Sequence, residues 1–388
     1  MATQGTRFFE VVTPLGTDVL LFRRMTGVER LGRLFQYQLD LLSEDPELAP
    51  SDLLGQNVSV RVDLPDGSER FFNGFVTRFA QLGRHGNHAA YQATLHPWLW
   101  FLTRTADCRI FQNKKVPDII KEVFGDNGFT DIEDSLSGDY REWEYCVQYR
   151  ETDFNFVSRL MEQEGIYYSF KHEQGKHQIV LCDGYSSHEK TPGYEKIPFF
   201  PPNEGDRRER DHIYDWRLSQ QVQSGAYVLN DFDFEKPKAN IEVNYQNPKS
   251  HDKADNEIFD YPGEYLESSD GDTYVKARLE ELLAQHELVE GTGNARGIAC
   301  GALFSLDQFP RQDQNREYLV VEANYEMQTN EYETTSSGPE TSYTCSFSAI
   351  ESKTPFRAPR TTPKPVVQGP QTAIVVGKSG EEIFTDEY

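Results

Sequence analysis

The sequence predicts a mixed fold that is mainly β, in which two strand-rich units flank an α/β region. Aromatic residues make up 13% of the 388 residues, with 25 Phe and 20 Tyr, and aromatic side chains favour strands. Short segments in which apolar and polar residues alternate with period two occur on both sides of the middle region. A chain of this length is expected to form two or three domains of about 150 residues each.

The first unit, residues 1–104, consists of strands and turns. The segment LFQYQLDLLS alternates with period two and places Phe35, Tyr37 and Leu39 on one side of a strand. A hairpin follows, because residues 58–64 alternate and residues 65–67, Pro-Asp-Gly, have the composition of a turn. Several short strands at this spacing predict a barrel or a sandwich.

The middle region, residues 105–206, combines helix and strand. The segment VPDIIKEVFGDNGF predicts a short helix with Pro117 in its first turn and Gly125 at its end. The stretch IPFFPPNEGDRRERD is rich in Pro and charge and predicts a boundary loop.

A second helix is predicted within YRETDFNFVSRLMEQEGIYYSF, residues 149–170. Thr152 and Asp153 are suited to cap its start, and Gly165 is suited to end it. Apolar side chains at helical spacing predict its core face: Phe156, Val157, Leu160 and Met161. Glu162 and Glu164 fall outside this stripe, so Glu162 is expected at a plain surface site.

The third unit, residues 207–354, returns to strands at HIYDWRLSQQV, AYVLNDFDFEKP and ANIEVNY. A helix is predicted from about Thr273 to Val289. Its expected apolar face is formed by Val275, Leu279, Leu282, Leu283 and His286. Residues 355–388 begin as a Pro-rich, extended linker. The sequence similarity between the two strand-rich units is too weak to indicate a repeat.

Composition excludes several classes of function. The chain has 39 Lys and Arg against 63 Asp and Glu, a net charge of −24, which disfavours nucleic acid as a partner. A mean hydropathy of −0.67 and the lack of a long apolar run argue against stable membrane insertion. The N-terminus lacks the pattern of a secretory signal peptide, so any export is expected to act on the folded protein. Five scattered Cys predict reduced, buried thiols.

Four motifs suggest chemistry but lack the required pattern. HEQGKH, residues 172–177, has the wrong His spacing for a zinc protease and is expected to be a solvated hairpin turn. GTGNARG, residues 291–297, is expected to follow a helix rather than the strand of a phosphate loop. SDGDT near Asp270 is expected to cap a helix rather than bind calcium. GYSSH, residues 184–188, lacks the Gly of a nucleophile elbow. The sequence therefore predicts no enzyme, and no catalytic, cofactor-binding or metal-binding residue.

Residues 149–170 resemble the ETDFxFxxRLxExEGIxYxF signature of the VgrG spike proteins of type VI secretion systems. Three further segments resemble the same family in family order: HPWLWFLTRTADCRIFQNKKVPDII, GALFSLDQFPRQDQNREYLVVEANYE and RAPRTTPKPVVQGPQTAIVVGKSGEEIFTDEY. Together the matching segments span nearly the whole chain. The last one resembles the linker and first strands of an oligonucleotide/oligosaccharide-binding (OB) barrel, and the sequence stops at Tyr388, just inside it.

The resemblance implies a structural hub similar to the baseplate hub of contractile phage tails. It implies two tube-like β-barrel domains, at residues 1–104 and 207–354, joined by an α/β domain at residues 105–206. The expected partners are two further copies of the chain in a homotrimer, the hexameric inner-tube protein, baseplate proteins, and a tip protein and effectors carried by the missing C-terminal part. The implied location is the bacterial cytoplasm during assembly, followed by secretion and puncture of a target cell. The alternatives are a hydrolase or toxin module and the hub of a phage or bacteriocin tail.

Overall fold

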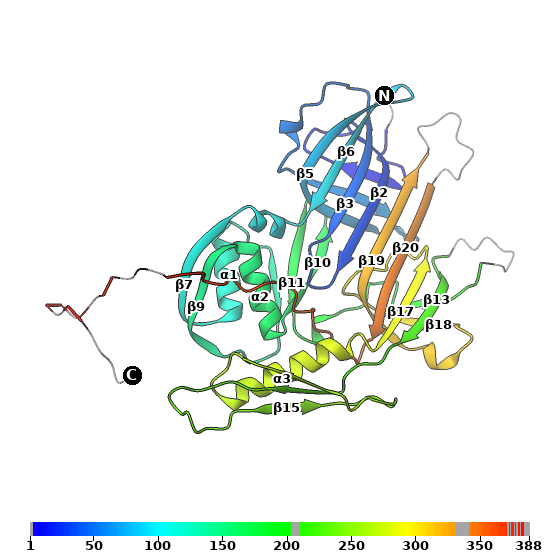
Figure 1. Cartoon of the computed structure of the whole chain (residues 1–388). Coiled ribbons are helices and arrows are strands. Elements are labelled where there is room, and N and C mark those ends of the chain that lie inside the picture. The colour runs from blue at the N-terminus through cyan, green and yellow to red at the C-terminus, as the bar shows by residue number, and fades with distance from the viewer. Residues whose placement is uncertain are drawn as a thin grey trace.

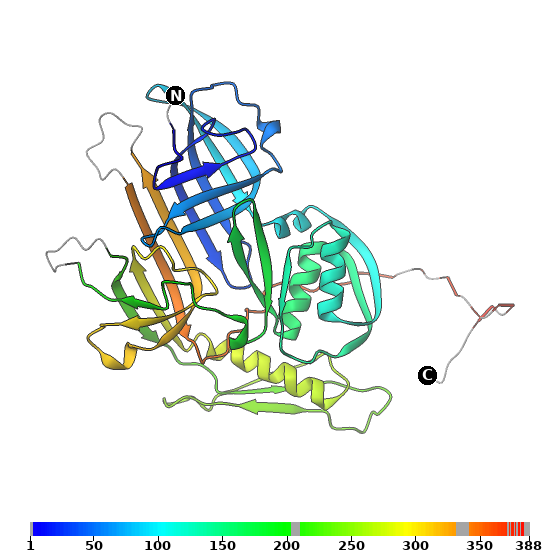
Figure 2. The same cartoon turned by 180° about the vertical axis from the view of Figure 1, so that it is seen from behind.

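The computed structural model describes residues 3–202, 210–330 and 341–370, together with isolated positions between 372 and 383. Figure 1 shows one long sheet that runs from the upper barrel to the lower right. Helices α1 (Val116–Asp126) and α2 (Asp153–Glu164) pack beside it, and α3 (Ser268–Leu283) lies below. Figure 2 shows the same arrangement from behind, where the short strands that close each barrel are visible. The fold is mostly strand, as the sequence predicts.

The main sheet has 12 strands, and ten follow one path in the order β1-β4-β5-β6-β3-β2-β19-β20-β17-β13. β18 pairs with β19, and β12 pairs with β18. The bounds are β1 Phe9–Val12, β2 Leu21–Arg30, β3 Gln36–Ser43, β4 Asn57–Asp63, β5 Glu69–His85, β6 His88–His96, β12 Lys196–Pro198, β13 Ile213–Gln220, β17 Glu287–Gly293, β18 Leu303–Asp307, β19 Glu317–Thr329 and β20 Thr341–Glu351.

The two strand-rich units are joined edge to edge. β2 of the first unit pairs with β19 of the second in an antiparallel ladder, with Gly27 opposite Tyr325. Both units contribute to one buried apolar cluster, which includes Phe22 and Met327. Sequence periodicity predicts each set of strands but not this ladder, because its two strands lie about three hundred residues apart.

The α/β region has its own apolar core. Helix α1 spans Val116–Asp126 and helix α2 spans Asp153–Glu164. The strands beside them are β7 Ala106–Lys115, β8 Ile132–Ser135, β9 Glu142–Thr152, β10 Tyr167–Glu173 and β11 Lys176–Cys182. The predicted stripe on α2 is buried. Thr152 caps the helix by accepting a hydrogen bond from the Asn155 N–H, and Gly165 ends it with a φ of 73°.

The third region differs from the prediction in its helix. Helix α3 spans Ser268–Leu283, whereas a helix from Thr273 to Val289 was expected. Val289 lies in β17, where it is buried and faces β20. Val289 continues the apolar spacing of the predicted helix, but it belongs to strand β17 instead. The SDGDT segment lies inside the first turns of α3, and no side-chain cap is formed.

A small sheet covers α3 on the side away from the main body, with strand order β15-β14-β16. Its strands are β14 Ala226–Leu229, β15 Val243–Gln246 and β16 Glu257–Asp260. Short 3-10 helices lie at Pro50–Asp52, Trp98–Thr103, Tyr185–Ser187 and Gln312–Gln314. Within the described ranges, no helix is both long enough and apolar enough to cross a membrane.

After β20 the chain is extended. Residues 355–370 contain no strand and pass over α2 before leaving the body of the molecule, as the red trace in Figure 1 shows. The OB-barrel strands expected after residue 370 fall on a segment that lies largely outside the described residues.

Candidate functional site: a linker groove and a buried domain junction

The extended residues 356–364 are bound in a groove of polar side chains, which we call the linker groove. They were expected to form a plain linker, but they contact the hub through hydrogen bonds and ion pairs from several elements. The groove is lined by Arg33, Asn155, Glu162, Asp260, Glu264, Glu280 and Glu281.

Glu162 is the central acceptor of this groove. Its carboxylate accepts the backbone N–H groups of Thr361 and Thr362 at 3.0 and 2.9 Å and the Thr362 hydroxyl at 2.9 Å. Arg33 donates to the same carboxylate at 2.9 Å. The Glu162 side chain is only 3% exposed. The expectation of a plain surface site was therefore wrong, because the linker covers the side of α2 that lies outside the apolar stripe.

Arg357 anchors the start of the linker. Its guanidinium pairs with Glu280 of α3 at 2.8 Å. The same group donates to the backbone carbonyl oxygens of Gly165 and Asp183, both at 2.8 Å. One side chain of the linker therefore ties together the C-terminus of α2, the strand end after β11 and helix α3. A planar guanidinium with several fixed donors is suited to this role.

Electrostatics favours this docking. Residues 355–365, PFRAPRTTPKP, contain three cationic side chains and no acidic one, in a chain of net charge −24. Arg360 pairs with Asp260 at 3.1 Å, and Lys364 pairs with Glu264 at 2.8 Å. Exposed pairs of this kind contribute up to about 1 kcal/mol each. The buried bonds to Glu162 and Arg357 therefore dominate the binding of the linker.

Helices α2 and α3 are linked by buried polar contacts next to the groove. Arg278 of α3, 4% exposed, donates to the backbone carbonyl of Glu162. The Glu164 carboxylate accepts from Trp143 Nε1 and from the Tyr274 hydroxyl, both at 2.9 Å. Burial raises the pKa of Glu164 above its usual range, and these two donors oppose the shift. The two helices that carry the groove are therefore joined by buried hydrogen bonds.

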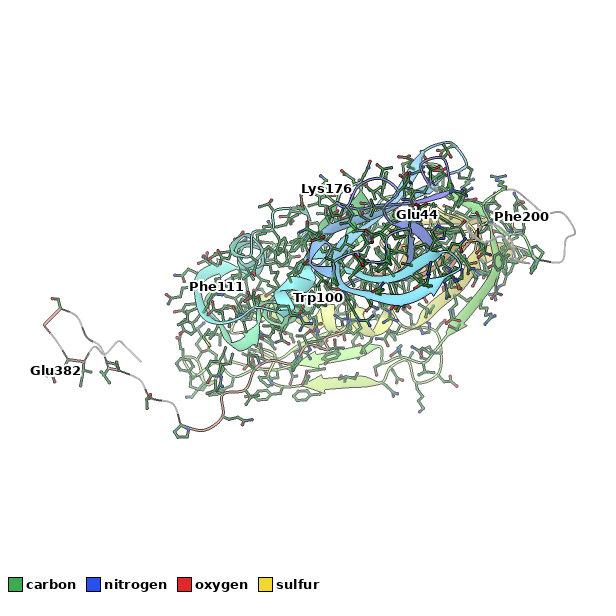
Figure 3. All side chains as sticks on the ribbon, turned by 90° about the horizontal axis from the view of Figure 1, so that it is seen from above. Glu44, Trp100, Phe111, Lys176, Phe200 and Glu382 are labelled. Carbon is green, nitrogen blue, oxygen red and sulfur yellow. The ribbon has the colours of Figure 1, made fainter. Side chains whose placement is uncertain are left out.

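A second polar cluster is buried where the β10–β11 hairpin meets the first strand-rich unit. The hairpin itself is as expected for HEQGKH, and Figure 3 shows Lys176 of its turn at the outside of the molecule. His177, however, is buried rather than solvated. Its Nε2 accepts the Trp98 N–H at 2.9 Å, so Nδ1 carries the proton and donates to Asn73 Oδ1 at 2.8 Å. Burial lowers the pKa of His177 well below its usual value.

The neighbouring His172 is also buried and neutral. Its Nδ1 accepts the Asn73 N–H at 3.1 Å, and its Nε2 lies 3.2 Å from the Tyr37 hydroxyl. Burial, together with the charge of Arg70, lowers the pKa of His172 to about 3. The expectation of a solvated turn was therefore wrong for the two histidines of this hairpin. Both rings join the hairpin to β5 and to the segment after β6.

Glu29 lies at the centre of this junction. Its carboxylate accepts the hydroxyls of Tyr37 and Tyr325, which come from the first and second strand-rich units. Burial raises the pKa of Glu29, although the nearby Arg70 opposes the shift. A cavity of about 500 Å³ lies beside Glu29 and is lined by Arg70, His172 and Cys300 among others. The side chains of Arg70, His172 and Cys300 all have hydrogen-bond partners within the protein. These contacts indicate that the cluster beside the cavity has a structural role.

His188 of GYSSH is buried and bonds to the Tyr167 hydroxyl and the Gly301 carbonyl. GTGNARG begins in strand β17 rather than after a helix. Cys108 is exposed, which corrects the expectation of buried thiols, and the other four Cys are buried. Within the described part of the chain, no group of three or more His, Cys, Asp and Glu has the geometry to hold a metal ion.

The groove residues were missed by sequence reasoning. The helical stripe identified the apolar side of α2 but said nothing about its other side, where Glu162 meets the linker. One signal was available, because a basic segment without acidic residues stands out in an acidic chain. It predicts an acidic partner surface but does not identify which of the 63 acidic residues forms it.

The chain is similar to curated type VI spike proteins. It is 54% identical over 385 residues to the spike protein VgrG1a of Pseudomonas aeruginosa, covering 99% of this chain and 60% of that protein. It is 53% identical over 385 residues to VgrG1b of the same organism, covering 99% of this chain and 52% of that protein. The actin cross-linking toxin VgrG1 of Vibrio cholerae is 31% identical over 97% of this chain, which covers 35% of the toxin. The chain thus spans only part of each relative.

Solved structures share the fold at low sequence identity. An Escherichia coli type VI secretion component, described as structurally similar to the T4 bacteriophage tail proteins gp27 and gp5, aligns with a TM-score of 0.67. It is 19% identical, and the alignment covers 93% of this chain and 82% of that chain. A 43 kDa prophage tail protein from Shewanella oneidensis aligns with a TM-score of 0.62 at 10% identity, over 89% of this chain and 99% of that chain.

The model of the family described as phage tail baseplate hub (GPD) matches residues 28–331, which include the α/β region and most of both strand-rich units. The chain therefore belongs to the phage tail baseplate hub family.

Proposed function

We propose that this chain is the hub part of a type VI secretion spike. Three copies form a ring that caps the hexameric inner tube, and the ring is driven out of the cell with the tube. The observation that carries the proposal is the 54% identity to a type VI spike protein over 99% of this chain. A phage or bacteriocin tail hub shares the fold and is the alternative.

The linker groove gives this proposal a mechanical basis. A spike that is pushed from below must transmit force from the ring to whatever follows the linker. In this chain the linker is held by Glu162 on α2 and by Glu280 on α3 through bonds of 2.8–3.0 Å. Anchoring at α2 and α3 spreads the load over both the α/β region and the third unit. We propose that the tip protein and the effectors attach to the part beyond this linker.

We propose four parts for the chain: residues 1–104, 105–206, 207–354 and 355–388. Separate apolar clusters support the α/β region and the region around α3. The two strand-rich units share one cluster, which supports treating them as a single rigid ring segment. Covering of the exposed sheet edges by neighbouring copies fits a closed oligomer.

We further propose that these residues contribute no catalysis. The relative with a toxin name matches over only 35% of its length, so most of that protein lies outside the shared region. The polar residues of the groove and the junction are engaged with protein partners at hydrogen-bond distance. Assembly in the cytoplasm followed by export through the type VI apparatus belongs to the same proposal.

Secretion by the source bacterium tests the proposal. Deleting this gene, together with any other spike genes, should abolish release of the inner-tube protein into the medium, measured by immunoblot. Restoring this gene in its full natural form should recover release. Unchanged release after the deletion would exclude the type VI function.

Light scattering on the 388-residue chain tests the trimer separately. We expect a monomer–trimer equilibrium that shifts to trimer with concentration. Added salt should also favour the trimer, because it screens the repulsion between acidic surfaces over a Debye length of about 10 Å at 0.1 M. A strict dimer at every concentration would be incompatible with a threefold hub.

A further inference from the structure

Residues 221–286 connect two neighbouring strands of the main sheet but are far longer than such a connection needs. β13 and β17 pair as antiparallel neighbours, and strands in that arrangement can be joined by about two to five residues. The connection instead contains the small sheet β15-β14-β16 and helix α3, which share an apolar core. Its inner side contacts α2 and forms part of the linker groove. Closure of the main sheet therefore does not explain its size, and its outer surface is a candidate for a second role.

The outer surface carries large apolar side chains at the ends of two strands. β14 and β16 are parallel, so their C-terminal ends lie side by side. The loops that follow are joined, since the Gly263 N–H donates to the Asn230 carbonyl at 3.0 Å and the Glu264 N–H donates to Asp231 Oδ2 at 2.6 Å. Four large apolar side chains on and beside these loops are about half exposed: Phe232, Phe259, Tyr261 and Leu266. Exposed apolar side chains that are grouped in this way mark a contact surface.

A surface hollow of about 330 Å³, which we call the loop hollow, lies between these loops and β9. Its apolar lining comes from Trp143 and Tyr145 of β9 and from Tyr265 and Leu266 of the second loop. Both walls are fixed from behind. The Tyr265 hydroxyl donates to two buried backbone carbonyls at 3.0 and 2.8 Å, and Trp143 Nε1 donates to the Glu164 carboxylate at 2.9 Å. A preformed hollow with this lining is suited to an aliphatic or aromatic side chain.

The polar lining of the loop hollow is mainly acidic. It consists of Arg141 and the carboxylates of Asp231, Glu144 and Glu264. The Arg141 guanidinium is held by the hub itself, because it donates to the Tyr274 hydroxyl at 2.8 Å and to the Glu264 backbone carbonyl at 2.9 Å. Carboxylates beside an aromatic wall favour a cationic side chain in the occupant.

The surrounding surface extends this acidic character. Residues 231–272 contain 12 Asp and Glu against four Lys, so they carry −8 of the net charge of −24 of the chain. The linker shows what such a surface binds, since Arg360 pairs with Asp260 and Lys364 pairs with Glu264. Glu264 lines both the linker groove and the loop hollow. The hollow therefore continues an interface that already holds an extended cationic segment.

We infer that the loop hollow binds an extended basic segment of a different protein. One aliphatic or aromatic side chain of that segment packs against Tyr145 and Leu266, and its Lys or Arg side chains lie beside Glu144 and Asp231. Other occupants have the wrong charge. Residues 371–388 carry one Lys against four acidic residues, a second copy carries −24, and lipid and nucleic-acid phosphates are anionic. This inference goes beyond the proposed function and does not depend on it.

Photo-cross-linking in the source bacterium identifies the occupant. The photoreactive amino acid p-benzoylphenylalanine replaces Leu266 in the full natural protein, which keeps the position apolar. Irradiation should join it to a peptide of a different protein, identified by mass spectrometry, with a net positive charge and an apolar residue near the link. The control places the same amino acid at Val222, which is exposed and does not line the hollow. The control should not give this adduct.

Binding of the cross-linked peptide, made synthetically, then tests the assigned contacts on the 388-residue chain. In fluorescence anisotropy, Leu266→Ser and Tyr145→Ser should each weaken binding about tenfold, because the anchor side chain loses its apolar wall. Replacing the Lys and Arg of the peptide with Gln should weaken binding by a similar factor, and added salt should weaken binding of the basic form. Val222→Ser is the matched control and should leave the affinity unchanged. Circular dichroism and urea midpoints equal to wild type establish that each variant is folded.

Several outcomes would overturn the inference. They are the lack of an adduct at residue 266, an adduct only with a second copy of this chain or with lipid, and an adduct with an acidic peptide. Equal affinity of the folded Leu266→Ser variant and wild type would overturn it as well. Each of these results would leave the proposed spike function standing, because that proposal is tested by release of the inner-tube protein.

Discussion

The Glu162 carboxylate accepts the backbone N–H and the hydroxyl of Thr362, a residue 200 positions later in the chain, both at 2.9 Å. This contact attaches the linker to the side of α2 that lies outside the apolar stripe. It also means that a helix with one apolar stripe is buried on two sides.

Replacing Glu162 with Ala should lower the free energy of unfolding by about 2–3 kcal/mol, because several donors lose a charged acceptor. It should also speed tryptic cleavage after Arg360, which the linker groove holds by its contacts to Asp260 and Glu281. Urea unfolding and timed proteolysis measure the two effects. The control is Glu144→Ala, at an exposed position on β9, where a change within about 0.5 kcal/mol is expected. Equal results for the two variants would refute the role assigned to Glu162.

Leu160→Ala should cost about 2–5 kcal/mol, through lost transfer energy and a residual cavity. Leu160 is 1% exposed and lies in the core of the α/β region. Proteolysis after Arg360 in the native state should stay close to wild type, since this side chain faces away from the linker. A loss of less than about 0.5 kcal/mol in the free energy of unfolding, measured in urea, would show that the stripe on α2 is not the core face.

Gly165→Ala should cost about 1–2 kcal/mol, because the residue has a φ of 73°. An added Cβ would also lie 3.3 Å from the Ala277 Cβ. Gly125→Ala is the matched control, since Gly125 lies within helix α1 with open space around its Cβ position. That substitution should stabilise the protein by up to about 1 kcal/mol. Thermal or urea unfolding of the pair would reveal opposite signs, and equal signs would contradict the cap.

Stability should fall as the pH drops below about 6.5, where histidines titrate in the unfolded chain. The pKa of His177 is lowered in the folded state by burial, so the unfolded state binds more protons in this range. Each such site contributes up to about 1.4 kcal/mol per pH unit. Glu29 acts in the opposite direction, because burial raises its pKa and the folded state binds the extra proton.

Comparison with His177→Gln isolates the histidine contribution. A Gln side chain retains an acceptor for the Trp98 N–H and a donor for Asn73 but does not titrate. The slope of the free energy of unfolding between pH 4 and pH 6.5 should therefore be smaller in this variant than in wild type. An unchanged slope would show that His177 does not titrate differently in the folded and unfolded states.

The sequence by itself determined the elements whose signals are local. The alternation of β3 and β4 and the stripe on α2 reflect neighbours two to four residues apart, and both were predicted correctly. The end of α2 at Gly165 follows from the freedom of glycine to adopt a positive φ. The sequence motif in residues 149–170 also indicated the family, and the hub-family match over residues 28–331 supports this.

Only the tertiary structure decided which distant segments meet. Three features depend on contacts between residues roughly 100 to 300 positions apart in the sequence. They are the pairing of β2 with β19, the burial of Glu162 by the linker, and the burial of the neutral residues His172 and His177. A side chain outside an apolar stripe is exposed only if nothing else covers it, and local periodicity carries no information about that cover. The boundary between α3 and β17 was decided in the same way, because pairing with β20 overrode a helical pattern that continued past Leu283.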